Sequence, residues 1–184
     1  NNSNILNNQK TLLIDTFFAS LLAVGSVSWL YYSDRLMEFP LGVFGVAIST
    51  VILPHLSRHQ AVSSHAVFSL TLDWALRAVC FVGVPASLVL AFLAGPILAT
   101  LFKHGHFTAW DVVMARKSVI AFSIGITPFM LVKILSAGFY AKQLLRIPVR
   151  VGVLAMIANA LLNMILIRFL QHAGIALATS LAAI

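Results

Sequence analysis

Charged side chains are scarce in this sequence of 184 residues. Only 9% of the residues are charged, 60% are hydrophobic, and the mean hydropathy is +0.98. Soluble domains carry about a quarter charged residues, so a soluble fold of this size could not cover its surface with so few polar side chains. We therefore predict an all-α protein, a bundle of helices that crosses a membrane several times.

Cysteine pairs and catalytic sequence motifs are also lacking. Cys80 is the single cysteine, so no internal disulfide is possible, and its apolar neighbours predict a buried thiol. Glycine-rich nucleotide-binding loops and serine-hydrolase motifs are absent from the sequence. His55 and His59 stand four residues apart but lack the glutamate of a zinc-protease motif. We expect no catalytic residue, no cofactor and no metal site.

The positive charge does not indicate a nucleic-acid partner. The net charge is +7, but the lysines and arginines are scattered at the ends of apolar runs and form no basic patch interleaved with aromatic residues. They indicate the orientation in the membrane instead. One expected side carries Lys10, Arg58, Arg77, Lys142, Arg146 and Arg150, and the other carries Lys103 and Arg168. The richer side is predicted to be cytoplasmic.

Both ends of the sequence suggest a piece of a larger, transporter-sized protein. The chain starts without methionine, and residues 1–10 are polar and lack the form of a signal peptide. The last apolar run, residues 174–184, is about half as long as the roughly 20 residues that a span needs. We expect one transmembrane region over residues 1–184.

The apolar runs predict five complete helices and a truncated sixth. The expected helices span about residues 5–23, 27–56, 68–93, 109–141, 149–170 and 174–184. Pro40, with Gly42 close behind it, is the predicted hinge of the second helix, and Pro85 is expected to interrupt the third. A loop with a short interfacial element is expected over residues 95–108. Trp29, Trp74 and Trp110 are predicted to anchor span ends at the membrane surface.

The stretch YYSDRLMEFP, residues 31–40, places three charges inside an apolar run. Asp34, Arg35 and Glu38 can share one helix face, because side chains three and four residues apart are neighbours on a helix. Charges inside a membrane are costly, so these must face the interior of a bundle or a watery cavity, and such groups usually mark transport pathways. The alternative is an ion pair that only locks the bundle together.

The sequence allows more than one role for three further ionisable residues. Asp15, in the first helix, could be a cavity acid, a ligand for a cation, or a cap or ion pair near the membrane surface. Arg116 and Lys133, in the fourth helix, could make a cavity cationic or could extend to the lipid headgroups. Asp73 and Arg77 form an i, i+4 pair expected at the rim.

Four stretches carry a resemblance to a known family. They are GSVSWLYYSDRLMEFPLGVFGVAISTVILPHLS, AGPILATLFKHGHFTAWDV, VKILSAGFYAKQLLRIPVR and QHAGIALATSLAA. The chain resembles the MurJ (MviN) family of flippases for lipid-linked peptidoglycan precursors, within the superfamily of multidrug and polysaccharide exporters. The resemblance implies a two-lobed transporter of fourteen helices, of which this chain is similar to the seventh helix through the start of the twelfth.

The resemblance also implies a site and a substrate. The cavity motif of the family, A-D-R-L-M-E-F-P, is matched by residues 33–40, with Ser33 in place of alanine. It implies that Arg35 and Glu38 line a central cavity and matter for transport. The implied substrate is lipid II, the undecaprenyl-pyrophosphate-linked precursor, moved to the outer leaflet of the bacterial cytoplasmic membrane by alternating access. Coupling to a cation or to the membrane potential stays open.

Three alternatives remain at this point. The first is another exporter of the superfamily, for drugs or for a different polyprenyl-linked sugar, against which the intact DRLMEFP motif argues. The second is an intramembrane enzyme that uses Asp15 and Asp34, although no local signature supports it. The third is a purely structural bundle, in which the charges of the second helix affect stability alone.

Overall fold

The computed structural model describes residues 25–61, 65–103 and 107–184, and almost all of these residues are helical. The elements are α2 (Ser26–Pro40), the π-helix η1 (Leu41–Val46), α3 (Ala47–Ala61), α4 (His65–Phe102), α5 (Ala109–Ala141), α6 (Arg146–Leu170) and α7 (His172–Ala182). Within the described residues, four stretches are long and apolar enough to span a membrane: Ser26–Arg58, Ala66–Phe102, Ala109–Ala141 and Arg146–Leu170. The predicted all-α membrane fold is confirmed for these ranges. The expected helix over residues 5–23 lies outside the described residues.

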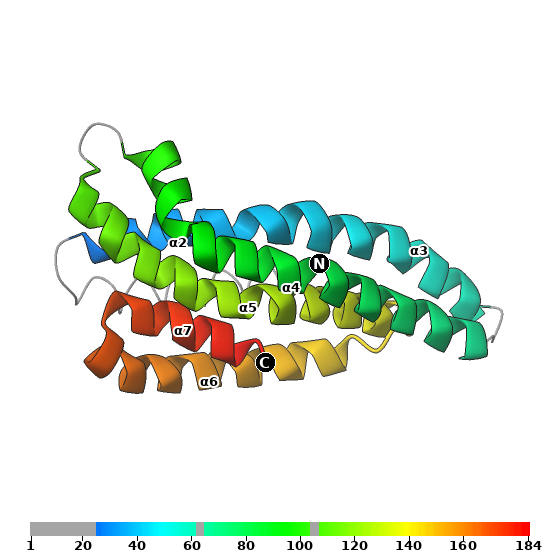
Figure 1. Cartoon of the computed structure of the whole chain (residues 1–184). Coiled ribbons are helices and arrows are strands. Elements are labelled where there is room, and N and C mark those ends of the chain that lie inside the picture. The colour runs from blue at the N-terminus through cyan, green and yellow to red at the C-terminus, as the bar shows by residue number, and fades with distance from the viewer. Residues whose placement is uncertain (1–24, 62–64, 104–106) are drawn as a thin grey trace.

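Helix α5 is the centre of the bundle. It packs against α2, α3, α4 and α7, and Figure 1 shows it running between α4 on one side and α6 with α7 on the other. One face of α5 is fully buried at Val119, Ile126, Met130 and Ile134. These positions recur at intervals of four and seven residues, which places them on one stripe of an α-helix. The helix begins and ends where the sequence predicted, at residues 109 and 141.

The second predicted helix is longer than expected and contains an irregular segment. The helix continues through residue 61, five residues past its predicted end at residue 56. Directly after Pro40 the backbone changes to the π-helix η1. A proline ring removes one backbone donor and collides with the carbonyl four residues earlier, and π-helical turns are common at such irregular sites. A wide π-helical turn therefore follows Pro40, and the bend of the helix at this point stays a prediction.

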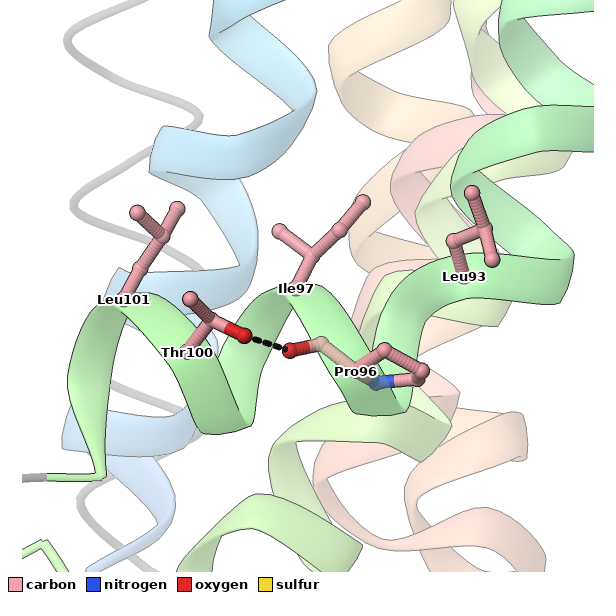
Figure 2. Close-up of a pocket in the computed structure, with 5 residues that line it drawn as sticks. All are labelled: Leu93, Pro96, Ile97, Thr100 and Leu101. Carbon is pink, nitrogen blue, oxygen red and sulfur yellow. Dashed lines mark hydrogen bonds between the residues drawn. The ribbon is translucent and has the colours of Figure 1, made fainter.

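The third helix extends further than predicted. Helix α4 continues past Pro85 to Phe102, so most of the loop expected from residue 95 is helical. The direction nevertheless changes at Pro96, where the last turns leave the main axis of α4 (Figures 1 and 2). Thr100 Oγ1 donates to the Pro96 carbonyl at 2.9 Å across this bend. A shallow apolar groove of about 320 Å³ follows the bend and is lined by Leu93, Pro96, Ile97, Thr100 and Leu101.

Two further expectations about burial are wrong. Cys80 is exposed, because one helical step turns it about 100° away from Val79, which lies on the buried stripe of α4. Trp29 is only 7% exposed, because its ring packs against Asp111 of α5 and His172 of α7. Trp74 and Trp110 are exposed, as the anchoring prediction requires.

The helix ends agree with the predicted grouping of basic residues. The end of α3, the start of α4, the end of α5 and the start of α6 lie at one end of the bundle (Figure 1). Arg58, Lys142 and Arg146 belong to these segments. The expected Asp73–Arg77 pair is formed, with Arg77 Nη2 at 2.9 Å from Asp73 Oδ2. Which end faces the cytoplasm stays a prediction.

Candidate functional site

Helix α2 has one face against the bundle and one face turned away from it. The inward residues are Ser26, Trp29, Leu30, Ser33, Leu36, Met37 and Pro40, all buried. The outward face carries Tyr31, Arg35, Glu38 and Phe39, all exposed. Because an α-helix has 3.6 residues per turn, the two sets occupy separate sides. The charged motif is therefore displayed on the outer side of this part of the protein.

Arg35 and Glu38 form a close ion pair on that outer face. Arg35 Nη1 lies 2.6 Å from Glu38 Oε2, and the side chains are 55% and 47% exposed. The guanidinium carbon of Arg35 also lies 5.0 Å from the centre of the Tyr31 ring, which is a cation–π distance. A guanidinium has five N–H donors in a planar fork, so the contact with Glu38 leaves donors of Arg35 available to an anion.

Lys133 of α5 joins this motif from a neighbouring helix. Its charge interacts with that of Glu38. Its stem lies beside Gly45 of η1, where an added Cβ would stand 3.6 Å from Lys133 Cδ. Lys133 is half-buried. Glu38 therefore lies near two cations supplied by different helices, Arg35 of α2 and Lys133 of α5. Asp34 is half-buried and directly precedes Arg35 on α2.

The other candidate residues are placed differently. Arg116 is exposed on α5, and its side chain lies over Gly95 at the bend of α4, where an added Cβ would stand 3.4 Å from Arg116 Cδ. It is therefore directed towards α4. Asp15 lies outside the described residues. Pro40 is buried, whereas Gly42 is exposed with no atom within 4 Å of an added Cβ. Their role as a hinge stays a prediction.

The sequence allowed the charged motif to face either the interior of the bundle or a watery cavity, and the structure reduces this choice. The half-exposed Arg35 and Glu38 do not point into the core formed by the described helices. An ion pair buried within that core is therefore excluded. A watery cavity at the outer face of α2 stays a prediction, and an ion pair exposed to water contributes little to stability.

Sequence reasoning missed a second cluster behind the motif. Trp29 Nε1 donates to Asp111 Oδ1 at 2.7 Å, and the rings of Trp29 and His172 lie 5.0 Å apart between centroids. Thr108 and Asp111 have the spacing of a capping box, which could have assigned the role of Asp111 at the start of α5. No local signal could have paired Trp29 with a residue 82 positions away.

Comparison with known proteins identifies the family. The family model "Lipid II flippase MurJ" matches residues 4–184. The chain belongs to the MurJ family. A probable lipid II flippase MurJ of Vibrio cholerae is 51% identical over 175 residues, covering 95% of this chain and 33% of the relative. One from Haemophilus influenzae is 48% identical over 181 residues, covering 95% and 35%. The lipid II flippase MurJ of Burkholderia cenocepacia is 42% identical over 176 residues, covering 95% and 34%.

A solved structure agrees with this family membership. The structure of a lipid II flippase MurJ in an inward closed conformation superposes with a TM-score of 0.90 at 29% identity, covering 97% of this chain and 38% of that one. The chain thus spans about a third of the length of its MurJ relatives. With its span-length helices it is part of a multi-pass protein of the bacterial inner membrane, in a family of transporters.

Proposed function

We propose that this chain forms part of a flippase that moves lipid II from the cytoplasmic to the outer leaflet by alternating access. The observation that carries the proposal is the Arg35–Glu38 pair on the outward face of α2. Relatives of the chain are named lipid II flippases. In this proposal Arg35 binds the anionic pyrophosphate of the substrate, because the planar guanidinium suits phosphate oxygens.

Glu38 and Lys133 complete the proposed headgroup site. Glu38 holds Arg35 when the cavity is empty, and the phosphate oxygens then compete with its carboxylate for the same donors. Lys133 adds a second positive charge near Glu38 and keeps the site attractive to an anion. Asp34 is the third residue of the proposed cavity surface. The wide turn after Pro40 supports a bending movement of the helix during the cycle.

The test compares three variants of the full-length protein that contains this sequence. Arg35→Ala should abolish the appearance of fluorescent lipid II in the outer leaflet of reconstituted vesicles. The double variant Arg35→Leu with Glu38→Leu should be abundant, as thermally stable as the original protein and equally inactive. Arg35→Lys should recover part of the rate, because lysine keeps the charge but loses the fork. Transport by the double-leucine variant would remove the headgroup-binding role.

A control separates this function from the intramembrane enzyme. Asp15 and Asp34 are each replaced by alanine, and transport and turnover of the lipid are followed together. A flippase should move lipid II without cleaving it and should depend on Arg35 more than on Asp15. Release of a cleaved headgroup that stops with either aspartate variant would support the enzyme.

A further inference from the structure

Trp29, Asp111 and His172 bring three helices together behind the charged face of α2. The indole Nε1 of Trp29 donates to Asp111 Oδ1 at 2.7 Å. Its ring meets the His172 ring edge to face at 5.0 Å, and His172 Nε2 lies 3.1 Å from the Met114 carbonyl oxygen. Trp29 and His172 are 7% and 3% exposed. A buried indole N–H needs an acceptor, and here a single carboxylate supplies it.

Asp111 is itself held in place by the start of α5. Its Oδ2 accepts from the backbone nitrogen of Thr108 at 2.7 Å and from Thr108 Oγ1 at 2.6 Å. The Thr108 hydroxyl in turn accepts from the Asp111 nitrogen at 3.3 Å. The capping box occupies one carboxylate oxygen and leaves the other for Trp29. The acceptor for Trp29 therefore has a position fixed by the backbone of α5.

A second contact repeats the first one turn further along both helices. Ser33 Oγ lies 3.0 Å from the Ala115 carbonyl oxygen and 2.6 Å from the Trp29 carbonyl oxygen. Residues 29 and 33 of α2 thus pair with residues 111 and 115 of α5. Two contacts in the same register define both the rotation of α2 about its axis and its position along α5.

The rotation of α2 decides where its charges point. Each residue of an α-helix advances by about 100°, so Glu38, nine residues after Trp29, lies about half a turn around the axis from it. Arg35 lies about 160° from Ser33 by the same count. Inward anchoring of Trp29 and Ser33 therefore turns Arg35 and Glu38 outward.

We propose that Trp29 is a positioning residue for transport, whose hydrogen bond to Asp111 holds α2 in the rotation that presents Arg35 to an anionic headgroup. This inference rests on the proposed function, since it assumes that Arg35 meets the headgroup. Trp29 does not touch the substrate in this scheme and acts through Arg35.

The test uses Trp29→Phe in the full-length protein and two lipid probes. Phenylalanine keeps an aromatic ring against His172 but removes the N–H donor. Binding of undecaprenyl pyrophosphate and of undecaprenol is measured in detergent, because only the first carries the charge that Arg35 would meet. Trp29→Phe should weaken binding of the pyrophosphate roughly tenfold, the scale of one lost hydrogen bond to a charged group, and change undecaprenol binding by less than about twofold. Trp110→Phe, at an exposed tryptophan of α5, is the matched control and should change neither.

The outcomes separate this inference from the proposed function. Arg35→Ala is measured with the same two probes. If Arg35→Ala weakens pyrophosphate binding and Trp29→Phe does not, the positioning role is wrong and the function stands. If Trp29→Phe weakens the binding of both lipids equally, Trp29 has only a structural role. If Arg35→Ala has no effect, the proposed function fails and the inference fails with it.

If Trp29→Phe folds poorly, a second variant tests the same inference. Asp111→Asn keeps the size of the side chain but removes the charge that serves both Thr108 and Trp29. It should also weaken pyrophosphate binding selectively. Spin labels at Val27→Cys and Val113→Cys, both exposed positions, report the distance between α2 and α5 in a Cys80→Ser background. A distance distribution unchanged by either variant would overturn the positioning role.

Discussion

The hydroxyl of Ser180 on α7 lies against the backbone of Gly125 on α5, so that a Cβ added at Gly125 would stand 2.7 Å from Ser180 Oγ. Ser180 Oγ also donates to the Ala121 carbonyl at 2.9 Å and has the Ala176 carbonyl at 3.0 Å. The absence of a side chain at Gly125 thus allows α7 to approach α5 closely. Small residues have this role in many membrane helix contacts.

Gly125→Ala is expected to destabilise the packing of α7 on α5. Alanine favours a helix by about 0.8–1 kcal/mol over glycine, but overpacking of a filled site costs about 1–3 kcal/mol. We therefore expect a net loss of about 1 kcal/mol, measured as a lower midpoint of thermal unfolding in detergent. Adding Ser180→Gly should restore part of the loss, and no recovery would mean that the clash lies elsewhere.

Gly42→Ala is the matched glycine substitution, because nothing lies within 4 Å of an added Cβ there. Thermal stability should be unchanged or slightly increased. If residue 42 is part of the hinge, the more restricted backbone should slow transport while binding of lipid II is retained. A normal transport rate would argue against a hinge at Gly42.

The capping box at the start of α5 gives a prediction about stability. Thr108→Ala removes the side chain that accepts from the Asp111 nitrogen, and such a loss typically costs about 1 kcal/mol. The backbone nitrogen of Thr108 and the indole of Trp29 can still donate to Asp111. We expect a lower unfolding midpoint with lipid binding retained. Loss of binding without loss of stability would show that Thr108 has a role beyond the cap.

Lys133→Met tests the second cation of the proposed site. Methionine keeps an apolar stem beside Gly45 but removes the charge near Glu38. Transport of lipid II should fall, by less than with Arg35→Ala, because Lys133 offers a point charge and lacks the planar fork. Lys117→Met, at an exposed position of the same helix, should leave the rate unchanged. Equal effects of the two lysine variants would contradict a specific role for Lys133.

The orientation in the membrane is tested by labelling from outside intact cells. Single cysteines at positions 58, 146 and 150, in a Cys80→Ser background, should be protected from a reagent that cannot cross the membrane. A cysteine at position 103 should react. Labelling of Arg146→Cys from outside would by itself contradict the predicted orientation.

The sequence predicted those features that depend on local pattern. The bounds of α5 follow from a long apolar run, and the charged face of α2 follows from the spacing of Arg35 and Glu38. The end of α4 was missed because Gly95 and Pro96 usually stop a helix, whereas here the helix bends and continues. The burial of Trp29 was missed because its partner Asp111 is distant in the sequence and only the packing of α2 on α5 brings them together.

The location of both Arg35 and Glu38 on one helix has a consequence for how the protein could move. An ion pair that bridges two helices must break when those helices separate, whereas a pair three residues apart on α2 travels as a unit in any rigid-body displacement. Such a pair carries a dipole and no net charge, so its own displacement through the electric field across the bilayer does almost no work. Any voltage dependence of the movement must therefore arise from the cargo or from charges outside the pair.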